Sequence, residues 1–261
     1  MSARKMPIAQ LDRSVLRLSG DDVTAWLDKL VTNSLGGEIT FTALLTPQGK
    51  IIADFFVTKH GDDLFIDTPT KFFDDLFKRL KMYRLRAPIE MTPEPDLNVY
   101  ALWDGDGELG HDDPRHGALG RRLITADYFD DTGDYNAHRL ALGVVDSMWD
   151  FEMTTMFPAD VNMELMNGVD FKKGCFIGQE VVSRMKRMTT VKKRARGLVL
   201  SGNAAAGDKI MMGSRVIGEV MSVHDTMAMG LIRLDRWQSG EESPTINEQR
   251  VSIMGGVDGS R

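Results

Sequence analysis

The first hundred residues alternate between strand-like and helix-like spacing of hydrophobic positions. Short apolar stretches bounded by turn residues predict strands, and apolar residues spaced three and four apart predict helices with one buried face. We therefore expect strands at 14–18, 42–45, 51–59, 64–67, 89–92 and 99–103, and helices over about 21–31 and 69–82. Interleaved elements of this kind predict an α+β fold, with helices on one face of a largely antiparallel sheet.

The pattern changes after residue 196, where short strand-like stretches are separated by glycines. These stretches lie at 197–200, 209–212, 215–223, 229–234 and 250–253. Many short strands without long helices are typical of a small β-barrel or sandwich. We predict two domains, residues 1–190 and 191–261, of which the second is a small β-barrel.

Composition indicates a globular protein without a membrane span. The 261 residues are 42% hydrophobic and 27% charged. Their longest apolar stretches are far shorter than the ~20 residues that cross a bilayer. The first ten residues lack the apolar core of a presequence, so we expect a cytoplasmic protein. The single cysteine excludes an internal disulfide and cannot by itself hold a structural zinc ion or a chelated cluster.

Charge is distributed unevenly along the chain. The net charge is −6, yet residues 172–196 contain nine Lys and Arg residues and a single acidic one, Glu180. This stretch is either a solvated charged face or a seat for an anionic ligand or partner. An RNA-binding module is an alternative, although the overall acidity and the lack of aromatic residues among the basic ones disfavour it.

Four potential metal ligands stand in a Gly- and Asp-rich stretch at 104–120. They are His111, Asp112, Asp113 and His116. A polar surface loop interrupted by a proline explains them better, so we predict no metal site.

The most informative segment covers residues 171–180, with the sequence FKKGCFIGQE. Two glycines bracket the only thiol, Cys175, and the apolar spacing that follows predicts a helix beginning directly after the segment. The positive end of that helix, together with Lys172 and Lys173, is expected to favour the thiolate of Cys175. A buried, unreactive cysteine is the alternative.

The eight positions from Lys173 to Glu180 match the pattern K-G-C-F/Y-x-G-Q-E. In this motif the chain resembles the YgfZ-type family, whose members are relatives of the aminomethyltransferase, or T-protein, of glycine cleavage. Further stretches that resemble the family lie at 13–33, 45–54, 83–86, 113–121, 167–173 and 217–222. The resemblance therefore extends over most of the chain.

The resemblance implies a T-protein-like mixed α/β domain, with ferredoxin-like layers around a folate cavity, followed by a small β-barrel. It also implies a tetrahydrofolate-binding accessory factor for the synthesis or repair of iron–sulfur enzymes, including enzymes that modify transfer RNA. Iron–sulfur client or scaffold proteins are the expected partners, with transient contact between a cluster and the motif cysteine.

Residue by residue, the resemblance gives two catalytic candidates and seven folate contacts. Cys175 is expected to supply thiolate chemistry, and Lys173 to support it by charge. The expected folate contacts are Asp54, Arg84, Asp146, Gly178, Gln179, Glu180 and Arg184.

Two departures from the relatives affect the expected chemistry. T-protein has paired acids where this chain has Ala53 and Asp54, so one carboxylate remains to handle the folate amine. A folate-dependent aminomethyl or methyl transferase is therefore the less favoured alternative. Many relatives also have a pterin-contacting glutamate where this chain has Ala141, and Asp146 is the expected substitute.

Overall fold

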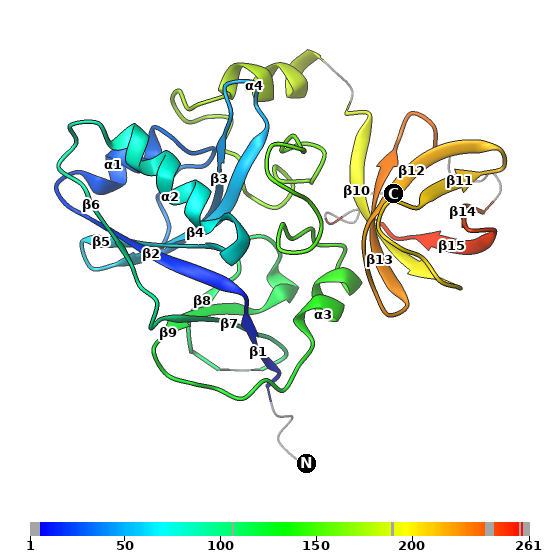
Figure 1. The fold of residues 1–261 in the computed structure, drawn as a ribbon, viewed down its shortest axis with the longest axis horizontal. Helices are drawn as coiled ribbons and strands as arrows, with labels where there is room; N and C mark the ends of the chain where they lie inside the picture. The colour runs from blue at the N-terminus through cyan, green and yellow to red at the C-terminus, as the bar shows by residue number, and fades with distance from the viewer. Residues whose placement is uncertain (1–5, 106, 189–190, 238–242, 256, 258–261) are drawn as a thin grey trace.

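The computed structural model describes residues 6–105, 107–188, 191–237, 243–255 and 257. Figure 1 shows two parts, an N-terminal part that contains the helices of the described residues and a C-terminal barrel. The helices are α1 (Val23–Asp28), α2 (Thr70–Arg84), α3 (Tyr135–Ala141), α4 (Gln179–Met188) and the short 3-10 helix η1 (Gly117–Leu119). Thr190, at the predicted domain boundary, lies outside the described residues.

Five antiparallel strands form the first sheet, in the order β3-β4-β5-β2-β6. They are β2 (Arg13–Ser19), β3 (Ile39–Leu45), β4 (Ile51–His60), β5 (Asp63–Pro69) and β6 (Glu90–Pro93). Helices α1 and α2 cover one face of this sheet, where a hydrophobic core excludes solvent. Helix α1 is shorter than predicted, because the chain leaves the helix after Asp28 and Val31 pairs with Leu44 of β3.

A second sheet lies beyond the other face of the first. Its strands β1 (Ile8–Leu11), β7 (Asn98–Leu102), β8 (His111–Asp112) and β9 (Arg121–Thr125) are arranged in the order β1-β7-β9-β8. The sequence predicts one sheet, whereas the chain crosses from one sheet to the other at Asp12, between β1 and β2. The prediction missed β1 and β9, and β9 was missed because its buried Arg122 gives it a polar pattern.

The C-terminal part is a closed antiparallel barrel, as predicted. Its strands, in order around the barrel, are β10 (Lys193–Leu200), β13 (Met227–Arg233), β12 (Arg215–His224), β11 (Lys209–Met212), β14 (Thr245–Ile246) and β15 (Gln249–Ile253). The barrel has its own core, in which Leu198, Ile210 and Ile232 are fully buried. Glycines 218 and 230 face this core at places where an added Cβ would collide with it.

A buried carboxylate, Asp150, contacts both the N-terminal part and the barrel. Arg139 of α3 has no exposed surface and donates to both carboxylate oxygens of Asp150, with an Nη2–Oδ1 distance of 3.0 Å. Ser222 of β12 donates its hydroxyl hydrogen to the same carboxylate. The barrel wall is therefore fixed to the chain that follows α3.

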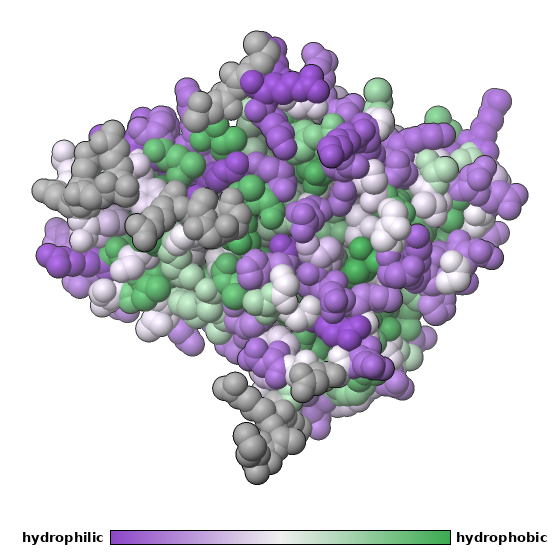
Figure 2. All heavy atoms as spheres, turned by 180° about the vertical axis from the view of Figure 1, so that it is seen from behind, coloured by the Kyte–Doolittle hydropathy of each residue, from purple (hydrophilic) through white to green (hydrophobic). Residues whose placement is uncertain are grey.

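The surface gives no sign of a membrane-spanning helix. Among the described residues, no helix is long and apolar enough to cross a bilayer. On the face shown in Figure 2, hydrophobic and polar side chains are interspersed.

Candidate functional site

The motif segment packs against the tip of the β3–β4 hairpin. Gly178 has a φ of 80°, and a Cβ atom at this position would lie 2.7 Å from the carbonyl oxygen of Thr46. Across the contact, a Cβ atom at Gly49 would lie 3.0 Å from the Cβ of Val181. The positive φ and the close approach together require glycine at both positions. Helix α4 begins directly afterwards at Gln179, as predicted.

Lys173 anchors the segment to the chain that follows α1. Its ammonium group donates to three carbonyl oxygens, at 2.6 Å from Asp28, 2.9 Å from Val31 and 3.1 Å from Asn33. Burial lowers the pKa of Lys173, although the Asp28 carboxylate, 3.4 Å away, opposes that change. All three ammonium hydrogens are therefore donated to backbone carbonyl oxygens. Any support of the Cys175 thiolate by Lys173 has to come from its charge, without a hydrogen bond.

Cys175 lies on the outside of the loop that these contacts hold. Its side chain is exposed, whereas the next two residues turn inward. Phe176 is 7% exposed and joins the core between the sheets, and Ile177 packs on the core beneath α1 and α2. The exposure excludes the alternative of a buried cysteine. The loop thus presents its thiol to solvent from a fixed backbone.

The other motif side chains contact the loop or solvent. Gln179 donates from Nε2 to the carbonyl oxygen of Gly174 at 3.3 Å, and Glu180 and Arg184 are exposed on α4. The exposed basic side chains of the segment and of α4 are Lys172, Arg184, Lys186 and Arg187. The exposed charged side chains of the segment and of α4 are therefore predominantly basic.

Two predicted folate contacts lie together in the interior, between the two sheets. Asp54 of β4 and Asp146, in the loop after α3, are 6% and 2% exposed. Ser147 donates its hydroxyl hydrogen to Asp54. Asp146 accepts hydrogen bonds from Arg115 at 2.9 Å and from the backbone N–H of Met148 at 3.0 Å. We call the buried polar group around them the charged seam, which consists of Arg13, Asp54, Asp67, Asp113, Arg115, Arg122, Tyr135, Asp146 and Ser147.

Three arginines surround the ring of Phe56 in the charged seam. Their guanidinium carbons lie 5.3 Å (Arg13), 4.8 Å (Arg115) and 3.7 Å (Arg122) from the ring centroid. Asp67 accepts from both Arg13 and Arg122. Within the described residues, Asp67 Oδ2 and the Nε and Nη1 atoms of Arg122 are buried without a hydrogen-bond partner. Such atoms are usually satisfied by ordered water or a polar ligand.

The two aspartates of the seam differ in ionisation. Burial, reinforced by the charge of Asp146, raises the pKa of Asp54 to about 6, against the opposing effect of Arg13. Burial also acts to raise the pKa of Asp146, but the nearby guanidinium groups, first that of Arg115, outweigh it and hold this pKa well below its usual range. Asp146 is thus a permanent anion, whereas Asp54 titrates near neutral pH.

The predicted site residues therefore occupy three places. Cys175 and the motif lie at the hairpin tip, and Asp54 and Asp146 lie in the seam. Arg84 is exposed at the end of α2, on the opposite face of the first sheet, and donates from Nη1 to the carbonyl oxygen of Ile89 at 3.2 Å. A single small ligand in the seam does not reach Arg84 across the sheet.

Sequence reasoning missed most of the seam. Arg13, Asp113 and Arg115 stand in stretches that resemble the family, but no pattern marked them as buried. Arg122 and Tyr135 belong to β9 and α3, two elements that the hydrophobic pattern did not predict. Two of the four potential metal ligands from the sequence, Asp113 and His116, lie in the loop before η1 and have protein partners. Asp113 accepts a hydrogen bond from Arg115, and His116 Nδ1 accepts one from the backbone N–H of Ala118 at 3.2 Å.

The fold is that of a glycine-cleavage aminomethyltransferase. The crystal structure of aminomethyltransferase T from Bartonella henselae covers 99% of this chain and 88% of its own, with a TM-score of 0.76 and 12% sequence identity. At this identity the match establishes the fold alone. The predicted T-protein-like fold is thereby confirmed.

Within that fold class, the chain is similar to iron–sulfur assembly factors. Residues 186–254 match the family model of the CAF17 C-terminal β-barrel domain. The mitochondrial "iron-sulfur cluster assembly factor IBA57" of Homo sapiens is 27% identical over 223 residues, which are 70% of this chain and 63% of the relative. The homologue from Mycosarcoma maydis is 27% identical over 217 residues, 70% of this chain and 54% of the relative. The chain thus spans between 54% and 63% of the length of these two relatives. Membership of the YgfZ-type family in particular remains a prediction.

Gly178→Ala is expected to destabilise the protein by about 2 kcal/mol or more, because alanine is strained at a positive φ and its Cβ would collide with Thr46. Gly174→Ala is the matched control in the same loop, since no atom lies within 4 Å of an added Cβ there. Urea unfolding of both variants measures the difference. Equal stabilities would show that the hairpin contact does not fix the loop.

Asp54→Asn is expected to remove a loss of stability that develops as the pH rises. The pKa of Asp54 rises from its ordinary 3.8 to about 6 on folding, so the unfolded chain ionises first. Stability from this group therefore falls between about pH 4 and pH 6 and stays lower above, by about 3 kcal/mol. Urea unfolding from acid to neutral pH should show the wild type losing this amount relative to the variant. Asp75→Asn, at an exposed position on α2, is the control, and a difference that does not vary with pH would refute the buried ionisation.

Proposed function

We propose that this protein is an accessory factor in the assembly of iron–sulfur clusters, and that Cys175 binds a cluster shared with a partner protein. The observation that carries the proposal is an exposed thiol, the only one in the chain, on a loop fixed by Lys173 and Gly178. The fold and the names of the relatives support it.

The number of ligands requires a partner. An iron–sulfur cluster is held by about four protein ligands, mostly cysteine thiolates. This chain has one cysteine, so the remaining thiolates have to come from a scaffold or client protein. The cluster is then cargo that passes between proteins. An exposed thiol suits this use, because the partner's ligands have to approach the same iron atoms.

The local charge favours the same use. A cluster with four thiolate ligands is an anion, and thiolates themselves are stabilised by nearby cations. The exposed side chains of Lys172 and of Arg184 and Lys186 on α4 supply positive charge around the loop. We therefore assign the exposed basic side chains of the 172–196 stretch to an anionic cluster and its partner protein, and not to RNA. Arg194, which pairs with Glu164, and the buried Arg196 are not part of this surface.

The second part of the proposal is that tetrahydrofolate binds in the charged seam. Its support is the polar chemistry of the seam, where Asp67 Oδ2 is an unused acceptor and Arg122 carries unused donors of the kind that a pterin ring pairs with. Asp54 and Asp146 would hold the ring. Tetrahydrofolate supplies a carrier for one-carbon groups when bound. Since Ala53 leaves a single acid in this part of β4, we propose binding without turnover.

The finer assignments of the proposal concern clients and location. Iron–sulfur enzymes that modify transfer RNA are the proposed clients, and the cytoplasm is the proposed location.

Cys175→Ser is expected to abolish cluster binding. The tag-free protein is incubated anaerobically with ferric iron, sulfide and glutathione, whose thiol can complete the ligand set in place of a partner. Visible absorption and circular dichroism should show a thiolate-bound cluster in the wild type. Gly174→Ala should retain these spectra, because it leaves the thiol in place. A Cys175→Ser variant that takes up the same cluster would refute the proposal.

Asp54→Asn is expected to weaken tetrahydrofolate binding by at least about tenfold, the effect of losing a hydrogen bond to a charged group. Calorimetric titration of the wild type should show a single site whose affinity falls as the pH is lowered through about 6. Asp75→Asn is again the control. Absence of any saturable heat in the wild type would remove the folate part of the proposal and leave the cluster part untouched.

A further inference from the structure

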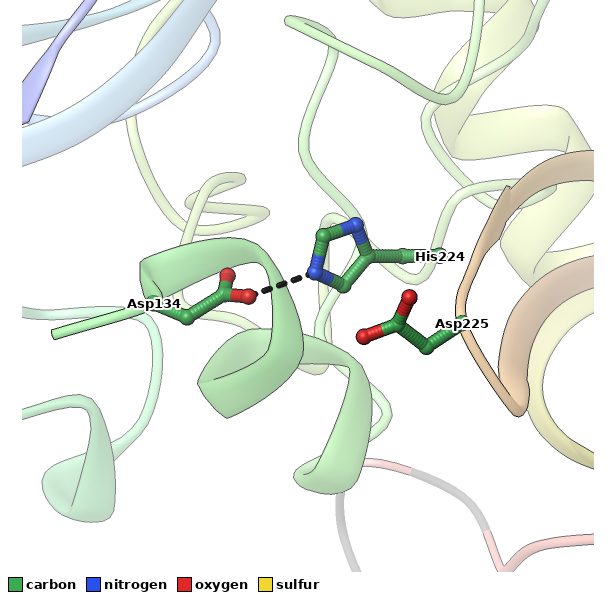
Figure 3. Close-up of side chains that lie close together, drawn as sticks. All are labelled: Asp134, His224 and Asp225. Atoms are coloured by element: carbon green, nitrogen blue, oxygen red, sulfur yellow. Dashed lines mark hydrogen bonds and ion pairs between the residues drawn. The ribbon is translucent and has the colours of Figure 1, made fainter.

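A cluster of three potential metal ligands lies far from the motif loop, where α3 meets the barrel. Figure 3 shows Asp134, at the start of α3, facing His224 and Asp225 from the β12–β13 hairpin. The Nε2 atom of His224 lies 2.6 Å from Asp134 Oδ2. One ligand atom from each of the three residues lies within 4.8 Å of the others.

Local geometry directs all three side chains to one point. Asp134 caps α3, and its Oδ1 accepts from the backbone N–H of Ala137 at 2.9 Å, which leaves Oδ2 to face the barrel. Neighbouring residues in a strand point to opposite faces. His224 is the last residue of β12, and Asp225 has a φ of 50° in the turn. This left-handed turn breaks the alternation, so both side chains face α3.

An imidazole and two carboxylates form a ligand set for first-row divalent transition metals. Zinc is typically bound at about 2.0–2.2 Å by such groups, which places neighbouring ligand atoms about 3.3 Å apart. The Nε2–Oδ2 pair needs to open slightly, and Asp225 needs to approach. Both movements are accessible, because the side chains of His224 and Asp134 are 29% and 51% exposed and Asp225 is exposed. Water can complete the coordination.

We propose that Asp134, His224 and Asp225 bind a divalent transition-metal ion of the zinc class, which links α3 to the barrel. Two carboxylates neutralise the charge of the ion, and imidazole favours transition metals over magnesium or calcium. Helix α3 also carries Arg139, whose pairing with Asp150 reaches Ser222 of β12. The ion would therefore add a second link between the same helix and the same strand. This inference is independent of the proposed function.

The test is a titration of the tag-free full-length protein with Co²⁺, whose visible absorption reports the ligand set, followed by displacement with Zn²⁺. A Cys175→Ser background removes the only thiol. A single saturable site is expected. His224→Ala and Asp225→Asn should each weaken it by at least about tenfold, since loss of even a second-sphere partner has this effect.

The hairpin between β4 and β5 supplies a matched control. It also carries a histidine and acidic residues, His60 with Asp62 and Asp63, but His60 stacks on Phe65 at a centroid distance of 4.8 Å. His60→Ala should bind Co²⁺ like the wild type.

Thermal unfolding gives a second readout. Zn²⁺ should raise the melting temperature of the wild type and of His60→Ala, because it binds the folded state, and should raise that of Asp225→Asn by a smaller amount. Unfolding in EDTA checks that Asp225→Asn is folded. Absence of a Co²⁺ spectrum, or a spectrum unchanged by His224→Ala, would overturn the proposal and leave a simple hydrogen bond between His224 and Asp134.

Discussion

Charge buried between the two sheets is the constraint on which the N-terminal part depends. Arginines from β2, from β9 and from the loop before η1 lie out of contact with solvent, beside aspartates of β4 and β5. Leaving a buried charge without its partner costs several kcal/mol. The two sheets can therefore pack well only in the arrangement that places Asp67 against both Arg13 and Arg122. The same requirement makes the space between the sheets polar, which a purely hydrophobic core would not be.

Buried cations fix the outer parts of the molecule in the same way. Lys173 holds three carbonyl oxygens of the chain after α1, and Arg139 binds Asp150, which Ser222 of the barrel also contacts. Lys173 joins segments 140–145 residues apart, whereas Arg139 and Asp150 lie 11 residues apart and the contact with the barrel is made by Ser222. The loop that carries the exposed Cys175 depends on the first of these contacts and on Phe176 and Ile177, which pack on the two cores. The position of the thiol is thus fixed by its neighbours in the loop.

Hydrophobic spacing predicted those elements that bury a continuous apolar face. The β3–β4 hairpin, α2 and most of the barrel strands follow from it, and the glycine-bracketed motif gave the start of α4. It failed where burial is polar. Strand β9 carries the buried Arg122, and α3 has seven residues, two of whose buried side chains are Tyr135 and Arg139. A hydrophobic pattern read from a single sequence assigns charged and polar residues to the solvent-facing side, so the second sheet was not predicted.

The sequence predicted only the part of the candidate site whose residues are neighbours in the chain. The segment from Lys173 to Glu180 indicates a functional thiol by its own sequence. The partners of Asp54 come from residues 13, 115, 146 and 147, which only the fold brings together. Both places nevertheless share one element. The tip of the β3–β4 hairpin holds Gly178, and β4 carries Asp54 into the seam, three residues beyond its first residue Ile51. The loop that carries the thiol and the seam residue Asp54 therefore both lie at the first end of β4, while each keeps its own solvent environment. For this reason a change in the seam leaves the exposure of Cys175 intact unless it also moves the hairpin.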